Sequence, residues 1–302
     1  MISASSASQA LTRQSTGVEG LDEMLGGGLL PGTLTVVVGA TGIGKTQLGL
    51  QFAEAGRSQE SHPGIIFDMT SRGDPQNHAD YATRMFGRAL SHADPEASPD
   101  LVDFFGAEQS YGDYLNIFRY TGKRVARGDL SFEEYQEWQA ALARKLGTAI
   151  GFFYGNFARG CRRAVVDGIE PLDRKRESIQ LELFEYVYQQ ILRKDPEWVA
   201  RDLFREHYRA REAEIARVQY DPKSIGCMLL YTSAETMLHQ LLERPLDEGD
   251  LLANANTIIF LGKIHSPDGR IGRSLHVAKH RGSACSDEIR PYAIDDRGVR
   301  ML

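Results

Sequence analysis

The stretch Gly39-Ala-Thr-Gly-Ile-Gly-Lys-Thr46 decides the fold of this chain of 302 residues. It fits the pattern G-x-x-x-x-G-K-[ST] at every fixed position. An apolar, β-branched run (33–38) precedes it, and a helical segment begins at Lys45. The glycines let successive backbone N–H groups turn inward around a β-phosphate, and the positive end of the helix adds to the attraction. This order of strand, glycine loop and helix predicts a P-loop, a binding element for nucleoside triphosphates.

The chemistry of the loop assigns two roles. Lys45 is predicted to bridge the β- and γ-phosphates, and the hydroxyl of Thr46 to be a magnesium ligand. A second segment, Arg163-Ala-Val-Val-Asp167, is an apolar strand that ends in a carboxylate. Beside a P-loop strand, such a carboxylate holds magnesium through a water molecule, so Asp167 is predicted to have the Walker B role. The predicted nucleotide-binding residues are Gly39, Ala40, Thr41, Gly42, Ile43, Gly44, Lys45, Thr46 and Gln47.

Further short apolar runs predict more strands of the same kind. They are uninterrupted rather than alternating, as in strands that are buried on both faces. The expected strands are 64–68, 101–105, 163–167, 227–231 and 257–261, followed by an antiparallel pair at 269–279 and 288–293. Helices are expected at 77–90 and 132–158, the latter lined by core aromatics. The pattern predicts an α/β fold with a mainly parallel sheet and helices on both faces.

Two stretches are longer than such a fold requires, and we interpret them as insertions at about 106–131 and 171–225. The second holds 11 acidic and 11 basic residues. Within it, Phe184, Val187, Tyr188 and Ile191 follow helical spacing, which predicts charged helices with one apolar stripe. That stripe needs a surface to cover it, so we expect 171–225 to contact a protein partner or another subunit. Residues 1–10 are expected to be a disordered tail and 11–302 a single domain.

Composition and charge narrow the function. The net charge of −6 offers no excess of cations for nucleic acid or an anionic membrane. The amino-terminal residues lack the pattern of a signal peptide, and no apolar run is long enough to span a membrane, so a cytoplasmic location is expected. The three cysteines are far apart and form no zinc or disulfide pattern. The histidines show no metal-ligand spacing, and we expect His265, His276 and His280 at the surface.

Three segments together resemble the KaiC-like ATPases of the RecA superfamily. They are Ser15-Thr-Gly-Val-Glu-Gly-Leu-Asp-Glu-Met-Leu-Gly-Gly-Gly28, the P-loop, and Lys279-His-Arg-Gly-Ser283 through Glu288-Ile-Arg290. The resemblance covers about 11–90, 160–170 and 227–300. It implies a RecA-like fold, ATP with Mg²⁺ as cofactors, and a homo-oligomer, most simply a hexameric ring. It also implies that Lys279 and Arg281 reach across a subunit boundary to the γ-phosphate of the neighbouring subunit, where their charge acts as an arginine finger does.

The chain departs from the resemblance after the second predicted strand. RecA-like enzymes carry there a glutamate that orients the attacking water. Alignment of Phe67-Asp-Met-Thr-Ser71 places Thr70, or Ser71, at that position. A hydroxyl group does not accept a proton from water at neutral pH as a carboxylate does. Asp68 and Asp74 are nearby but not in the glutamate position. Lys45, Asp167 and the degenerate position Thr70 are therefore the catalytic residues to test, and we expect slow or absent hydrolysis.

Three functions compete. The first is a ring-forming, ATP-binding switch that regulates a protein partner. The second is a recombinase-like, DNA-binding ATPase, which the balanced charge of 171–225 disfavours because few phosphate contacts are available. The third is a scaffold that binds ATP and hydrolyses it poorly, similar to a member of archaeal motility machines. Thr70 favours this third function over a fast motor.

Overall fold

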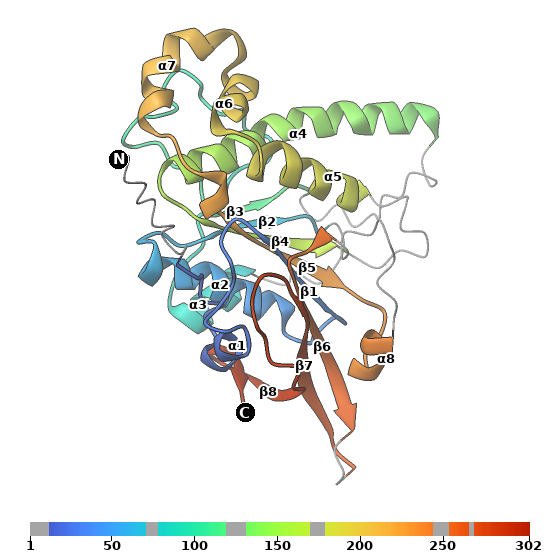
Figure 1. Cartoon of the computed structure of the whole chain (residues 1–302). Helices are drawn as coiled ribbons and strands as arrows, with labels where there is room; N and C mark the ends of the chain where they lie inside the picture. Colours follow the sequence, from blue (N-terminus) through green and yellow to red (C-terminus); the bar gives the residue numbers. More distant parts are fainter. Residues whose placement is uncertain (1–11, 71–77, 119–130, 170–178, 244–253, 266–268) are drawn as a thin grey trace, which may run out of the picture.

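A nine-stranded sheet lies at the centre of the computed structural model, which describes residues 12–70, 78–118, 131–169, 179–243, 254–265 and 269–302 (Figure 1). Its strand order is β3-β2-β4-β5-β1-β6-β7-β8-β9. The strands are β1 (Leu34–Gly39), β2 (Ile65–Asp68), β3 (Tyr114–Asn116), β4 (Arg163–Ile169), β5 (Gly226–Thr232), β6 (Thr257–His265), β7 (Ile271–His280), β8 (Arg290–Asp295) and β9 (Gly298–Met301). Strands β1 to β6 run parallel, and β7 to β9 continue the sheet in antiparallel pairs. The predicted α/β class with a mainly parallel sheet is confirmed.

Helices cover both faces of the sheet. They are α1 (Glu19–Met24), α2 (Lys45–Gln59), α3 (His78–Phe86), α4 (Phe132–Ala158), α5 (Ile179–Val187), α6 (Pro196–Phe204), α7 (Tyr208–Arg217) and α8 (Leu238–Glu243). Alternate residues of β1 face opposite sides, because side chains alternate along a strand. Val37 packs with buried residues of α1, α2 and α3. Val36 and Val38 pack in the second cluster, with buried residues of α4, α5 and α6.

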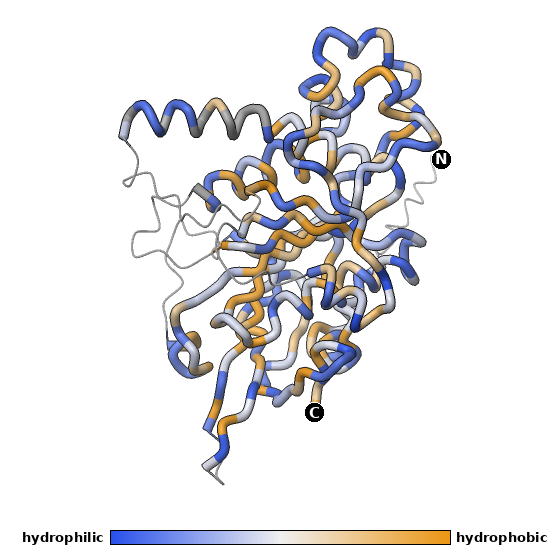
Figure 2. The backbone as a smooth tube through the Cα atoms, turned by 180° about the vertical axis from the view of Figure 1, so that it is seen from behind, coloured by the Kyte–Doolittle hydropathy of each residue, from blue (hydrophilic) through white to orange (hydrophobic). Residues whose placement is uncertain are grey.

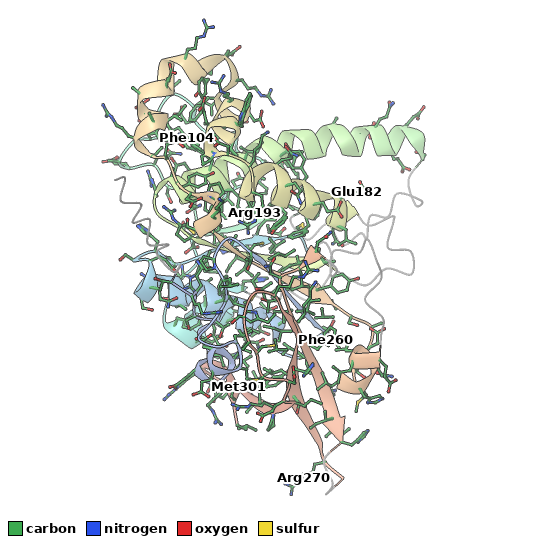
Figure 3. The ribbon with its side chains drawn as sticks, viewed as in Figure 1. Phe104, Glu182, Arg193, Phe260, Arg270 and Met301 are labelled. Atoms are coloured by element: carbon green, nitrogen blue, oxygen red, sulfur yellow. The ribbon has the colours of Figure 1, made fainter. Side chains whose placement is uncertain are left out.

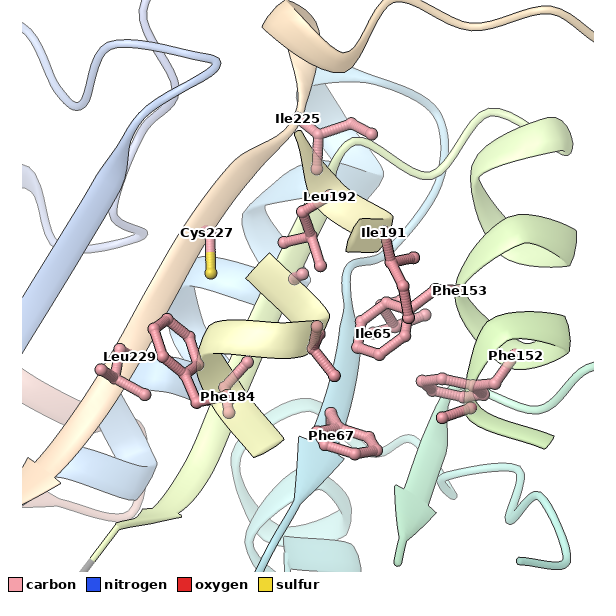
Figure 4. Close-up of a cluster of buried hydrophobic side chains, with 14 of the residues drawn as sticks. Ile65, Phe67, Phe152, Phe153, Phe184, Ile191, Leu192, Ile225, Cys227 and Leu229 are labelled. Carbon is pink, nitrogen blue, oxygen red and sulfur yellow. The ribbon is translucent and has the colours of Figure 1, made fainter. Parts of the chain in front are cut away.

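The apolar stripe of the predicted insertion is part of the main core. Phe184, Val187 and Ile191 are fully buried. Figure 4 shows Phe184 and Ile191 over the side chains of β2 and β5. The stripe therefore needs no other chain to cover it, and the expected partner surface on 171–225 is wrong for these residues. The reason is tertiary: this face of the sheet requires a helical layer, and α5 with the π-helical turn Tyr188–Leu192 supplies it.

The third strand is not where the sequence pattern placed it. Residues 101–105 form turns, in which the carboxylate of Asp100 accepts hydrogen bonds from the backbone N–H of Val102 and Asp103. Phe104 instead enters an aromatic cluster with Tyr154 and Phe204, at the α6–α7 end of the molecule (Figure 3). Strand β3 lies further along the chain and pairs with β2. An apolar run can be recruited by an aromatic core as well as by a sheet, and the pattern alone does not distinguish the two.

The carboxyl-terminal strands bring the end of the chain onto α2. The antiparallel pair β7–β8 confirms the predicted one, whereas β9 was not predicted. The side chain of Gln51 in α2 donates to the carbonyl oxygen of Val299 at 3.0 Å and accepts from its backbone N–H at 2.8 Å. The β6–β7 pair extends beyond the sheet, with Arg270 near its outer end (Figure 3). This arrangement places β8 and β9 beside the start of α2.

Hydropathy follows the layers. Figure 2 shows apolar residues concentrated in the central strands and polar residues on the outer helices. Helix α4 begins with a capping box formed by Ser131 and Glu134, and its first turns project from the body (Figure 1). Among the residues that the structure describes, no helix combines the length and the hydropathy that a membrane span needs.

Candidate functional site: a P-loop with a bridged pair of buried carboxylates

The P-loop leaves the carboxyl end of β1 and leads into α2. Gly42 and Gly44 have φ angles of 75° and 109°, a left-handed region that favours glycine. A Cβ atom on Gly44 would lie 2.9 Å from the Cδ1 atom of Ile294. The hydroxyl of Tyr292 donates to the carbonyl oxygen of Ile43 at 2.6 Å. Strand β8 therefore supports the loop from outside, and this contact was not apparent from the sequence.

Lys45 points back into its own loop. Its Nζ atom donates to the carbonyl oxygens of Gly39 and Ala40, each at 2.9 Å. Burial lowers the pKa of Lys45 to about 8, and the negative charge of Asp167 partly opposes that shift. The ammonium group is thus desolvated and held by neutral carbonyl oxygens. Negatively charged phosphate oxygens can take the place of these carbonyls and form stronger hydrogen bonds with the ammonium group.

Thr46 and Asp167 meet although 121 positions separate them. The hydroxyl of Thr46 donates to Oδ2 of Asp167 at 3.0 Å. Burial on its own would raise the pKa of Asp167. The hydrogen bond and charge of His78, with smaller contributions from Lys45 and Thr46, outweigh burial and hold that pKa below its usual range. Asp167 is accordingly a carboxylate at neutral pH, as a magnesium-water acceptor must be.

A second carboxylate lies directly beside Asp167. Asp68 is its partner in the pairing of β2 with β4, and it is fully buried. One oxygen of Asp68 accepts from the backbone N–H of Thr70 at 2.7 Å, and the other accepts from the hydroxyl of Tyr114 at 2.5 Å. Both carboxylate oxygens of Asp68 therefore accept hydrogen bonds from within the chain.

His78 bridges the two carboxylates. Its Nε2 atom lies 3.1 Å from Oδ2 of Asp167, and its Nδ1 atom lies 3.6 Å from Oδ2 of Asp68. The side chain is buried, at the first residue of α3. Two neighbouring buried acids repel each other, and a hydrogen-bonding imidazole between them reduces that cost. Sequence reasoning missed His78, because no spacing links it with either acid and only the β2–β4 pairing brings the three together.

Only part of the segment that aligns with the glutamate of RecA-like enzymes belongs to the residues that the structure describes. Ser71 and Asp74 lie outside the described residues, whereas Thr70 is half-buried at the end of β2. Gly168 has a φ angle of 99°, at a register shift in β4. A Cβ atom there would lie 2.4 Å from the backbone nitrogen of Thr70. Glycine at this position lets the two strand ends approach, which sets the place of Thr70 relative to Asp167.

Lys279 and Arg281 lie toward the opposite edge of the sheet from the P-loop. Lys279 pairs with Ile258, which pairs with Val36, three residues before Gly39. At about 3.3 Å per residue, this is roughly 10 Å back along β1. Strand β7 ends at His280, so Arg281 follows the strand rather than belonging to it. Burial lowers the pKa of Lys279, and the positive charge of Arg281 lowers it further.

The three histidines that were expected at the surface differ in their exposure. His265 is exposed and His276 is half-buried, but His280 is 7% exposed, so the expectation is wrong for His280. Its Nδ1 atom lies 2.9 Å from the hydroxyl of Thr257. The absence of metal-ligand spacing had suggested a surface residue, whereas alternation along β7 turns the side chain of His280 toward the interior.

The comparisons with known proteins agree with this geometry. Residues 14–189 match the family model of the KaiC ATPases, and this range includes the P-loop, Asp68, His78 and Asp167. The chain belongs to the KaiC family of ATPases. The family resemblance inferred from the sequence is therefore confirmed.

Individual relatives are distant. The circadian clock protein KaiC2 of Synechocystis is 22% identical over 302 residues, covering 98% of this chain and 41% of that protein. The circadian clock oscillator protein KaiC of Prochlorococcus marinus is 31% identical over 132 residues, covering 40% of this chain and 26% of that protein. A UPF0273 protein of Methanopyrus kandleri is 25% identical and covers 97% of this chain and 92% of its own length. The chain thus spans less than half the length of the two clock proteins.

The donor set fits a magnesium ion that is bound mainly through a nucleotide. Magnesium prefers oxygen ligands, keeps several waters and takes one or two protein groups together with substrate phosphates. The adjoining oxygens of Thr46 and Asp167 provide such groups. The described part of the chain contains no cluster of three acidic, histidine or cysteine side chains that could hold a metal unaided. A bound magnesium ion would supply charge neutralisation at the phosphates.

Proposed function

We propose that this chain binds ATP with Mg²⁺ at its P-loop and assembles head-to-tail as a nucleotide-dependent switch or scaffold. Lys45 would exchange its two carbonyl acceptors for β- and γ-phosphate oxygens, and residues 40–44 would surround the β-phosphate. Thr46 and Asp167 would hold the metal. Family membership supports nucleotide binding, and the meeting of Thr46 with Asp167 beneath the P-loop is the observation that carries the assignment to these residues.

Assembly is proposed from the separation of the two charged groups. Lys279 and Arg281 lie too far back along the sheet to serve the P-loop of their own chain. If they serve a neighbouring chain, the interface is heterologous, and it closes into a ring or continues as a helix. We take 11–302 as one domain and a hexamer as the ring size that family resemblance favours. A protein partner would read the nucleotide state of this assembly.

Slow or absent hydrolysis is the third part of the proposal. Both carboxylate oxygens of Asp68 accept hydrogen bonds from within the chain, and Thr70 offers only a hydroxyl. Neither is a good base for water at neutral pH in this arrangement. Slow turnover suits a switch or scaffold, because each nucleotide state then lasts long enough for a partner to bind.

Calorimetry of ATP binding tests the site. Lys45→Ala should lower ATP affinity at least tenfold, because it removes the cation that meets two phosphates. Lys223→Ala is the matched control, since Lys223 is exposed in the 3₁₀ turn before β5. Mass photometry with and without ATP, together with a phosphate-release assay, measures assembly and turnover. Unchanged ATP affinity in a folded Lys45→Ala protein would refute the site.

A further inference from the structure

A hydrogen-bonded bracket surrounds His280, the residue between Lys279 and Arg281. Its Nδ1 atom lies 2.9 Å from the hydroxyl of Thr257 on β6, and its Nε2 atom lies 3.4 Å from Nη1 of Arg13. Arginine can only donate in such a contact, so the contact with Arg13 favours the tautomer of His280 that carries its proton on Nδ1, next to Thr257. Burial, and then the charge of Arg13, lower the pKa of His280 and favour this neutral form.

Arg13 fixes the other side of the bracket. Its Nη1 atom donates to the carbonyl oxygen of Gly28 at 2.9 Å and more weakly to that of Leu25 at 3.4 Å. Its Nη2 atom donates to the hydroxyl of Ser283 at 2.5 Å. One guanidinium group therefore joins the turn after α1, the end of β7 and the loop that follows Arg281.

The backbone around the two cations is held in the same way. The N–H of Arg281 donates to the carbonyl oxygen of Asn256 at 2.9 Å, and the N–H of Ser286 donates to that of Met24 at 2.9 Å. His280 is turned inward and buried, and Lys279, its neighbour on β7, faces the other side of the strand. The bracket thus holds the end of β7 and the backbone of Arg281, from which the two cations extend.

We propose that Arg13 and His280 are positioning residues that aim Lys279 and Arg281 at the γ-phosphate of a nucleotide bound by a second copy of this chain. The proposal rests on the head-to-tail assembly proposed above. Neither positioning residue touches the phosphate. Two flexible cations contribute most when their direction is fixed before the phosphate arrives, since less entropy is then lost on binding.

A double-mutant cycle tests whether the bracket acts through Arg281. Arg13→Lys keeps the charge but loses the planar fork that joins Gly28, His280 and Ser283. His280→Leu removes both ring contacts, whereas His280→Gln retains one donor and one acceptor. Each change is made alone and with Arg281→Ala, and Arg209→Lys on exposed α7 is the control. Mass photometry gives the assembly midpoint with ATP and with ADP, and a fluorescent ATP analogue gives the affinity of the monomer.

We expect Arg13→Lys and His280→Leu each to weaken ATP-promoted assembly about fivefold or more, in the range of a typical coupling between sites. Monomer affinity for the ATP analogue should be unchanged, and His280→Gln should recover part of the assembly lost in His280→Leu. In the Arg281→Ala background, the same changes should have a clearly smaller effect, because one of their two targets is gone. A merely structural role would weaken assembly by the same factor in both backgrounds, and that result overturns the proposal.

The outcomes separate this inference from the proposed function. If Arg281→Ala assembles with ATP as the wild type does, head-to-tail assembly through this edge is wrong, and the inference ends with it. If Arg281→Ala weakens assembly while the bracket variants do not, only the bracket is refuted. Circular dichroism and thermal melts verify folding. Should His280→Leu fail to fold, Ser283→Ala removes a single outer contact of Arg13 and completes the same cycle.

Discussion

Asp68 and Asp167 are neighbours across β2 and β4, and this pair distinguishes the site from a bare P-loop. Asp167 keeps its charge because His78, Lys45 and Thr46 together outweigh the cost of its burial. Asp68 is held by Thr70 and Tyr114. His78 lies between the two acids, so the end of β2, the start of α3 and the carboxylate of Asp167 form one network. A change in any member should be felt by the others.

Removal of His78 should destabilise the fold. His78→Ala leaves two adjacent buried carboxylates without the imidazole that reduces their repulsion, and we expect a loss in the usual range for a buried substitution, about 0.5–3 kcal/mol. Urea unfolding without nucleotide measures the loss of unfolding free energy. His239→Ala, on the exposed face of α8, should change stability by less than about 0.5 kcal/mol. Equal stabilities of the two variants would mean that His78 does not hold the acids.

The lowered pKa of Lys45 predicts a pH dependence of ATP binding. With a pKa of about 8, the free protein loses the ammonium charge as pH rises through 8, whereas bound phosphates favour the charged form. ATP affinity should therefore be highest below pH 8 and fall roughly tenfold by pH 9. Calorimetry between pH 7.5 and pH 9 measures it. Lys45→Arg stays charged in this range, so its ATP affinity should vary little; a parallel fall in both proteins would assign the effect elsewhere.

Hydrolysis should be slow in the wild type and faster in Thr70→Glu. The substitution places a carboxylate where RecA-like enzymes carry one, and turnover should rise from well below the common enzyme range of about 1 per second. Thr70→Gln is the matched control, because it has similar size without a basic carboxylate. Phosphate release at saturating ATP distinguishes them. Brisk turnover in the wild type would point to another base, and Asp68→Asn would then be the next variant.

The local sequence pattern was sufficient to place the residues that we propose bind phosphate. The P-loop motif is contiguous, so Lys45 and Thr46 could be placed from the sequence, and the apolar strand before Asp167 placed that carboxylate beside them. His78 could not be predicted in this way, since its partners lie in β2 and β4 and its own neighbours form no motif. The inward direction of His280 was equally hidden, because it depends on Arg13 and Thr257 rather than on adjacent residues.

At the scale of elements, α5 with the turn that follows it is a layer of the core rather than an appendage. The apolar stripe was correctly predicted from helical spacing. The surface against which the stripe packs was not predicted. Arg193, just after the π-helical turn, donates to the carbonyl oxygens of Thr33, Pro222 and Ile225, and so ties this layer to the starts of β1 and β5. Deletion of 172–224 would expose the apolar faces of β2, β4 and β5.

Two aromatic residues on α5 test this assignment. Phe184 is fully buried against the sheet, so Phe184→Ala should lower the free energy of unfolding by about 3–5 kcal/mol. Tyr186 lies on the same helix and is 36% exposed, and Tyr186→Ala should cost about 1 kcal/mol or less. Urea unfolding compares the two. Similar small losses would mean that α5 is loosely attached and serves a surface elsewhere.

The strands show which secondary-structure elements a local sequence pattern can predict and which it cannot. Buried parallel strands were recognised from uninterrupted apolar runs, because both of their faces are covered. The run 101–105 had the same composition but joined an aromatic cluster, while β3 and β9 are short, and their pairing is decided by β2 and β8. Short edge elements depend on the strand beside them, which a local pattern does not contain.

At the scale of the whole molecule, the sheet separates the P-loop from Lys279 and Arg281, the two cations that we propose act on a neighbour's nucleotide. The P-loop occupies the carboxyl edge of the parallel strands, and Lys279 with Arg281 lies back along β7. Under this proposal, a monomer holds both halves of a composite site without being able to join them. ATP that bridges two chains links binding to assembly, and each must then strengthen the other by the same factor. ATP should promote the oligomer, and Arg281→Ala should weaken that promotion while the monomer still binds ATP.

Mixing two defective subunits is the sharpest test of this arrangement. Arg281→Ala keeps an intact P-loop, and Lys45→Ala keeps intact cations. In a randomly mixed ring, about a quarter of the boundaries would pair a good P-loop with good cations, since the interface is heterologous. ATP-promoted assembly, measured by mass photometry, should therefore recover partly in the mixture although each variant alone is impaired. Two copies of the same variant give no intact boundary, so each protein alone is its own control. A mixture no better than its components would show that the cations serve no neighbouring nucleotide.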